Sequence, residues 1–139
     1  MQNKYQINMK TYSCNKIVKA EPMTLGFFES TRNRKMYPNA DDDTKYDATA
    51  DGYLVKYEDG YESWSPKAVF EAGYRCIETA KDRVQIELTD LQIKLESLQA
   101  FVNSDKFNEL GEYMQKLLLE QKASMTDYAD MLEQRLQLM

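Results

Sequence analysis

The feature that most constrains this chain is a pair of long apolar stripes in its C-terminal half. In residues 84–102 the stripe advances by alternating steps of four and three: Val84, Leu88, Leu91, Leu95, Leu98 and Val102. Residues 114–139 repeat those steps: Met114, Leu118, Gln121, Met125, Tyr128, Leu132, Arg135 and Met139. Such spacing keeps side chains on one face of an α-helix. It predicts an antiparallel hairpin of two helices, about 80–102 and 112–138, joined through a short turn ending near Phe107.

Two long polar side chains interrupt the second stripe, at positions that the spacing predicts to be buried in the seam. A buried polar group without a partner costs about 1–3 kcal/mol, so Gln121 and Arg135 each need another residue, another subunit or a ligand. Gln121 suits either a register-setting contact within a helical bundle or a ligand contact. Arg135 suits either the helix C-terminus, where the dipole favours a cation, or a phosphate clamp.

Each helix also carries a second stripe. It consists of Ile86, Ile93 and Ala100 in the first helix, and of Leu117, Ser124, Met131 and Leu138 in the second. A hairpin buries only one stripe per helix, so the second stripes need another surface. We therefore expect self-association through the helices, as a dimer or a larger bundle. The alternative is a compact monomer.

Residues 1–75 predict a small β-rich module with short helices. Residues 52–57 and 61–64 read as two strands joined by Asp59-Gly60, a favoured hairpin turn. Ser65-Pro66 then indicates a helix start with Ser65 as N-cap, and Gly73 ends that helix. The expected fold class is α+β: a small N-terminal antiparallel sheet in residues 1–75, followed by a long helical hairpin in residues 76–139 that mediates oligomerisation.

Less is indicated elsewhere in this module. Weak alternation before residue 22 favours one or two strands, and Thr24 is a candidate N-cap for a short helix. Residues 31–51 read as a polar surface loop with an acidic run at 41–43.

Charge and residue usage narrow the class of protein. The net charge is −5, and the deficit lies on the hairpin: residues 76–139 carry 7 Lys and Arg against 12 Asp and Glu, whereas residues 1–75 carry 11 of each. This argues against nucleic-acid polymers as partners, since binding them requires a basic face. There is no histidine, the two cysteines match no metal spacing, and no catalytic motif is present. We expect no enzyme, no cofactor and no metal. Without a signal peptide or an apolar run of about 20 residues, we expect a cytoplasmic protein with no membrane partner.

Several side chains are candidates for ligand binding. The aromatic rings near the hairpin loop and seam suit either the core or stacking on a purine, and Tyr128 has a hydroxyl that seeks a partner when buried. Arg32, Arg34 and Lys35 form a basic cluster that suits either solvated surface or phosphates bound by a neighbouring chain. The candidate ligand-binding set is Arg135, Tyr128, Gln121, Phe101, Phe107, Met125, Arg32 and Arg34.

Two stretches together resemble small bacteriophage and prophage proteins. One is Glu21-Pro22-Met23-Thr24 followed by GYLVKYEDGYESWSPK at residues 52–67. The other is the pattern that includes Leu98, Phe101, Phe107, Leu118, Gln121, Tyr128, Leu132 and Arg135. The chain is similar to the type 1 Thoeris anti-defence sponges.

The resemblance implies a sheet followed by a pair of long helices that assemble into dimers and hexamers. It implies binding, without cleavage, of cyclic ADP-ribose isomers of the glyco-cyclic ADP-ribose type, made by bacterial TIR-domain immune proteins; some such proteins also bind cyclic oligonucleotides. The implied pocket lies between subunits and uses aromatic stacking with arginine contacts to phosphate. The expected function is thus phage-encoded sequestration of an immune signal in the host bacterial cytoplasm. The alternatives are a structural or protein-interaction module without a small ligand, and a variant that degrades the signal.

Overall fold

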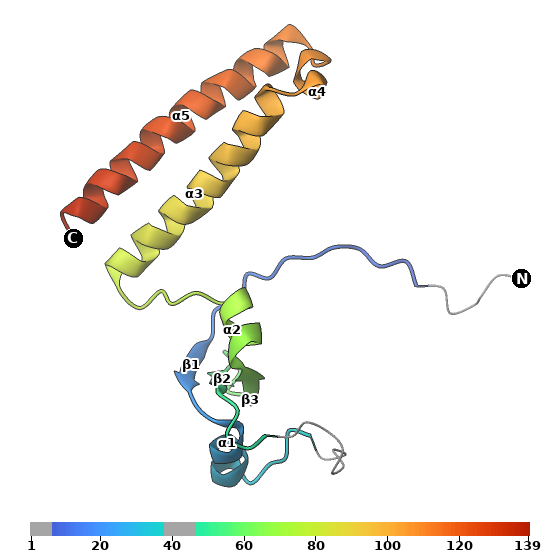
Figure 1. The fold of residues 1–139 in the computed structure, drawn as a ribbon, viewed down its shortest axis with the longest axis vertical. Helices are drawn as coiled ribbons and strands as arrows, with labels where there is room; N and C mark the ends of the chain where they lie inside the picture. Colours follow the sequence, from blue (N-terminus) through green and yellow to red (C-terminus); the bar gives the residue numbers. More distant parts are fainter. Residues whose placement is uncertain (1–6, 38–46) are drawn as a thin grey trace, which may run out of the picture. The chain divides into compact units, whose positions relative to one another are not determined.

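The structure, a computed structural model, describes residues 7–37 and 47–139 and divides into two compact units, Met1–Tyr74 and Arg75–Met139. The first unit contains a three-stranded antiparallel sheet with short helices, and the second contains a pair of long helices (Figure 1). The predicted α+β class is confirmed. In the described ranges, no helix is long and apolar enough to cross a membrane.

The sheet of the first unit has the strand order β1-β2-β3, formed by β1 (Lys19–Pro22), β2 (Gly52–Lys56) and β3 (Glu62–Pro66). The predicted hairpin between β2 and β3 is confirmed, and its turn is closed by the Tyr57 N–H, which donates to the Tyr61 carbonyl at 2.9 Å. Of the weakly alternating stretch before residue 22, only β1 is a strand among the described residues, and residues 7–18 lie in neither helix nor strand.

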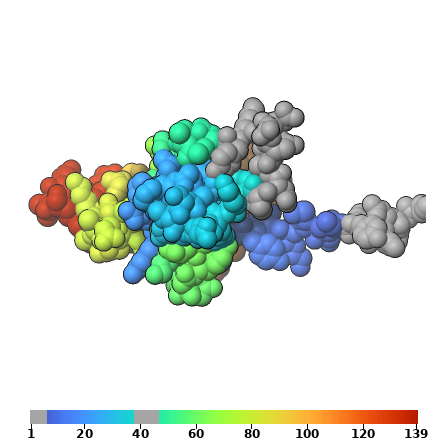
Figure 2. Space-filling model, turned by 90° about the horizontal axis from the view of Figure 1, so that it is seen from below, coloured from blue at the N-terminus to red at the C-terminus, as the bar shows by residue number. Residues whose placement is uncertain are grey.

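Helix α1 (Leu25–Arg32) covers one face of this sheet and is the surface nearest the viewer in Figure 2. The predicted N-cap is confirmed, because the Thr24 hydroxyl accepts a hydrogen bond from the Phe27 N–H. Leu25 and Phe28 pack against Leu54 and Trp64 in a buried cluster. The predicted loop begins later than residue 31, since α1 continues to Arg32; the acidic run at 41–43 lies outside the described residues.

Trp64 is held from two sides in this cluster. Its indole N–H donates to the Met23 carbonyl at 2.8 Å, and its ring lies so close to Gly52 that a Cβ at that position would be 2.4 Å from the ring carbon Cζ2. Gly52 is therefore required by the close approach of β2 and the indole ring.

Helix α2 (Lys67–Gly73) stacks its aromatic residue on a tyrosine of β2. The Phe70 ring centroid lies 4.2 Å from that of Tyr53 and 4.9 Å from that of Tyr74. The predicted N-cap is wrong: Pro66 occupies the cap position, with no side-chain cap, and the Ser65 hydroxyl instead donates to the Pro66 carbonyl. Pro66 belongs to the end of β3, and the helix begins at Lys67.

The second unit consists of α3 (Ala80–Val102), the one-turn helix α4 (Asp105–Asn108) and α5 (Glu112–Gln137), with α3 and α5 side by side (Figure 1). These bounds agree with the predicted helices to within one residue. A capping box fixes the start of α3, because the Thr79 hydroxyl accepts from the Asp82 N–H and the Asp82 carboxylate accepts from the Thr79 N–H.

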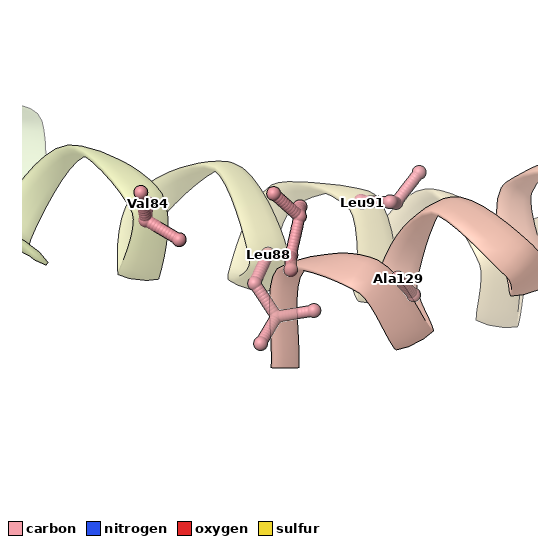
Figure 3. Packing of buried hydrophobic residues seen from close by; sticks show 5 residues of the cluster. Val84, Leu88, Leu91 and Ala129 are labelled. Atoms are coloured by element: carbon pink, nitrogen blue, oxygen red, sulfur yellow. The ribbon is translucent and has the colours of Figure 1, made fainter. Parts of the chain in front are cut away.

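The seam between the two helices buries Val84, Leu88 and Leu91 of α3 against Ala129 and Leu132 of α5 (Figure 3). The first half of the predicted α3 stripe is therefore buried in the seam, whereas Leu95, Leu98 and Val102 are half-buried. The predicted α5 stripe is only half correct: Met125 and Leu132 lie in the seam, but the other seam residues of α5 are Ala129 and Leu136, in place of the predicted Tyr128 and Arg135. Neighbouring residues of a helix are about 100° apart, and small Ala129 lets α3 approach where Tyr128 would hold it away.

Candidate functional site

A row of exposed side chains runs along α5 beside the seam. It advances by alternating steps of three and four and is exposed at every position: Met114, Leu117, Gln121, Ser124, Tyr128, Met131, Arg135 and Leu138. We call this set the α5 stripe. It unites three of the predicted ligand-binding residues with the second apolar stripe predicted for this helix.

The prediction that Gln121 and Arg135 are buried in the seam is wrong for the single chain, since both are exposed. The Gln121 amide lies 3.7 Å from the Met125 sulfur, a weak contact. Within the described ranges, the side chains of Arg135 and Tyr128 have no hydrogen-bond or ion-pair partner, and Tyr128 remains 43% exposed. Both are therefore available to another molecule.

The other predicted residues of the hairpin pack within it. Phe101 and Phe107 meet edge to face with ring centroids 6.3 Å apart, and Phe107 is only 7% exposed. Met125 packs against the buried seam. None of the three belongs to the α5 stripe, and the buried ring of Phe107 offers little surface for stacking.

The predicted basic cluster lies in the first unit, where its arginines tie α1 and the residues after it to β3. Arg32 pairs with the Glu62 carboxylate at 3.2 Å. Arg34 donates to the Glu62 carbonyl at 2.5 Å and to the Tyr61 hydroxyl at 2.7 Å. Both guanidinium groups are thus used within the unit.

Sequence reasoning missed an ion pair between the segment that precedes α3 and the middle of that helix. Arg75 donates to both carboxylate oxygens of Asp90, at 2.6 and 3.1 Å, and this pairing lowers the pKa of Asp90 and raises the pKa of Arg75. Arg83 donates to the Ile77 carbonyl, which fixes the same segment to α3. No sequence periodicity predicts this pair, because the two residues lie 15 positions apart across a loop.

The cations of α5 are few, and only one lies on the α5 stripe. Lys116 lies off the stripe, 4.0 Å from Glu120, and Lys122 is half-buried at the seam. Arg135 is the one basic residue of the α5 stripe, and it lies in the last turn of the helix, where the dipole favours a cation.

An amide, an aromatic ring and a guanidinium thus recur at steps of seven on one exposed face, about 10 Å apart at 1.5 Å per residue. This set suits a flat ring joined to an anionic group at that distance. In the part of the chain that the structure describes, no group of His, Cys, Asp or Glu side chains is placed to hold a metal ion.

Comparison with known proteins matches a protein family to the helical hairpin. Residues 78–138, which include α3, α4 and α5, match the family described as Sequestin. No solved structure matches the chain. An uncharacterized 7.5 kDa protein of Enterobacteria phage T4, from the denB-rIIB intergenic region, is 41% identical over 54 residues, which are 39% of this chain and 84% of the T4 protein. The chain therefore belongs to the family of this small phage protein, and its helical hairpin carries the Sequestin match.

Proposed function

We propose that the protein is a phage anti-defence protein that sequesters a small cyclic nucleotide immune signal in the host cytoplasm without degrading it. The proposed ligand class is cyclic ADP-ribose isomers, with cyclic oligonucleotides as the second class to test. The Sequestin match, the T4 relative and the resemblance to Thoeris sponges support this proposal. The observation that carries it is the α5 stripe, on which Gln121, Tyr128 and Arg135 face solvent together.

Exposed apolar side chains on the same stripe support assembly as part of the function. Met131 is 61% exposed and Met114 is 50% exposed, and on the outer side of α3 Ile93 is 58% exposed. A soluble single chain rarely leaves so regular an apolar row uncovered. We propose that two copies pair through their α5 stripes.

The spacing of the polar residues selects one register for this pairing. Gln121 and Arg135 lie seven residues to either side of Tyr128. In an antiparallel pair with its two-fold axis at Tyr128, Arg135 of one copy lies opposite Gln121 of the other. Symmetric pairing of this kind repeats each contact twice, and it leaves neither Gln121 nor Arg135 opposite an apolar residue.

In this arrangement each ligand site combines two chains. The Tyr128 ring stacks on the base, Arg135 of the same copy binds the phosphates, and the Gln121 amide of the second copy donates to a phosphate oxygen. Binding of this kind needs no general base or nucleophile, because sequestration requires affinity without turnover.

A recovery experiment tests sequestration. The purified protein is incubated with the product of a TIR-domain enzyme, removed by filtration and heat-denatured, and the released signal is identified by mass spectrometry. Depletion followed by recovery of intact signal is the expected result. Depletion with only cleaved product recovered would show an enzyme instead. No depletion, with assembly intact, would favour the alternative of a protein-interaction module that uses the apolar residues of the α5 stripe.

Mixing two inactive variants tests the shared site. Arg135→Leu and Gln121→Leu each remove one contributor, so each variant alone should lose ligand uptake while still assembling. After co-refolding in equal amounts, mixed pairs contain one intact site, and random pairing should restore about one quarter of the wild-type capacity.

Lys116→Leu and Gln137→Leu are the matched controls, because they make the same changes on α5 but off the α5 stripe. Both should keep full uptake. If mixing restores nothing while the wild type still binds, the site lies within one copy and the proposed register is wrong. A monomer by size-exclusion chromatography with light scattering would also contradict the pairing.

A further inference from the structure

The first unit contains a groove that the proposed function does not use. It has a volume of about 620 Å³ and lies between the N-terminal segment and the β2–β3 turn, lined by Asn15, Lys16, Ile17, Tyr57, Glu58, Asp59 and Tyr61. This volume is within the usual range of sites for small molecules and side chains.

The turn side of the groove is held in one conformation. The Tyr57 and Tyr61 rings stack with centroids 5.9 Å apart. The Asp59 carboxylate accepts a hydrogen bond from the Tyr61 N–H at 3.0 Å, and Gly60 adopts the left-handed φ of 90° that the turn requires. The two rings are therefore presented by a preformed turn.

Each of these rings already carries a cation of the same chain. The Arg34 guanidinium lies 5.1 Å from the Tyr61 centroid and is fixed by its hydrogen bonds to Tyr61 and Glu62. The Lys16 ammonium lies 5.5 Å from the Tyr57 centroid. Among the described residues, this ammonium has no ion pair or hydrogen bond, and its segment is neither helix nor strand. Arg34 is thus fixed in place, whereas Lys16 is held weakly.

The charges of the groove favour a positive ligand. Among the described residues that line the groove, Lys16 is the one cation, whereas Glu58 and Asp59 are both acidic, and the exposed Glu58 carboxylate has no partner in the described ranges. Aromatic faces attract cations, and a guanidinium or ammonium group gains about 0.5–1 kcal/mol at an exposed ring. An anionic ligand would meet two carboxylates.

We propose that this groove binds a basic side chain from a partner protein, which replaces Lys16 over the Tyr57 ring. The partner supplies a guanidinium or ammonium group on a flexible segment. The face of the Tyr57 ring and the Glu58 carboxylate bind this group. This makes the first unit a docking module, independent of any ligand bound at the α5 stripe.

Titration of the full-length protein with the peptide acetyl-Gly-Arg-Gly-amide, followed by NMR, tests the proposal. The amide shifts should be confined to residues 57–61 and the N-terminal segment. Lys16→Met removes the competing cation and should tighten binding about two- to fivefold, the gain expected for one cation–aromatic contact. Glu58→Gln should weaken binding, without any change in the rings.

Lys19→Met is the matched control, because Lys19 is an exposed lysine of β1 that contacts no ring among the described residues. It changes the net charge equally and should alter affinity less than twofold, the range for exposed charges. Equal effects of Lys16→Met and Lys19→Met would overturn the proposal, since the change in net charge alone would then account for the change in affinity. So would binding of adenosine monophosphate that is lost in Lys16→Met, because the groove would then be an anion site.

Discussion

The two units of this protein are stabilised in different ways. The first collects its core from residues far apart in sequence, Leu25, Phe28, Leu54 and Trp64, and fastens it with directed bonds such as that from the Trp64 indole to Met23. The second repeats one short spacing along two helices, and the buried residues of its seam are all apolar. The fold of the first unit thus depends on a few individual residues, and that of the second on the regular spacing of apolar residues along its helices.

This difference has a consequence for what each unit leaves on its surface. A periodic helix packs one face and leaves the adjoining face free, so α5 can pack against α3 and still expose the α5 stripe. The first unit instead has a groove beside its hairpin turn. The following predictions test whether the two units unfold independently.

The largest effect is expected for Phe28→Ala in the first unit. Phe28 is completely buried, and truncating a buried Phe costs about 3–5 kcal/mol of the free energy of unfolding. Trp64 is the only tryptophan, so its fluorescence during urea unfolding reports this unit. The helical circular dichroism transition of the hairpin should stay in place. An equal shift of both transitions would show that the units unfold as one.

Leu132→Ala is the converse experiment in the second unit. Leu132 is 1% exposed and lies at the centre of the seam, so its truncation should cost about 2–5 kcal/mol. The loss should appear in the helical signal, with the Trp64 transition unchanged. Met131→Ala is the control, because Met131 lies one position away but is 61% exposed. In dilute monomer it should change stability by less than about 0.5 kcal/mol.

Thr79→Ala should have a smaller effect, confined to the start of α3. It removes the hydroxyl that accepts from the Asp82 N–H at 3.0 Å, and loss of such a cap costs about 1 kcal/mol. Hydrogen exchange should accelerate for the first-turn amides of α3. Thr79→Ser keeps the acceptor and should restore protection; protection unchanged in Thr79→Ala would show that the cap is unimportant.

The smallest effect concerns pH. The hydrogen bond from the Thr79 N–H to the carboxylate lowers the pKa of Asp82 below its ordinary value of 3.8. Because the folded pKa is the lower one, this contribution to stability is fully present above the ordinary pKa. It is lost as the pH falls through the folded value. The melting temperature of the wild type should fall more steeply over this acidic range than that of Asp82→Asn. Parallel profiles would contradict the assignment.

The sequence was sufficient to predict the elements that depend on local signals. The Asp59-Gly60 turn and the Thr24 cap are each read from adjacent residues, and both are present. The α5 seam was only partly predicted, because two stripes one residue apart both have helical periodicity. The choice between them depends on the size of Ala129 against α3, which is a property of the contact between helices.

The site was predicted less well than the fold. Gln121, Tyr128 and Arg135 were correctly grouped on one face, but that face is beside the seam. Residues such as Arg75 and Asp90 meet through a loop that follows no period. Long-range pairs of this kind cannot be found from spacing, whereas repeated contacts along a helix can.

The close approach of Gly52 to Trp64 has a consequence for how the chain can vary. A Cβ at Gly52 would lie 2.3 Å from the Ser65 carbonyl oxygen, and one at Gly26 would lie 2.9 Å from the Ala48 carbonyl oxygen. At Gly73 and Gly111 the same added carbon meets nothing within 4 Å. In a library of random variants selected for folding, alanine should thus be absent at Gly26 and Gly52 but common at Gly73 and Gly111. Selection for folding alone would thus keep glycine at the two positions where the backbone approaches a neighbouring carbonyl most closely.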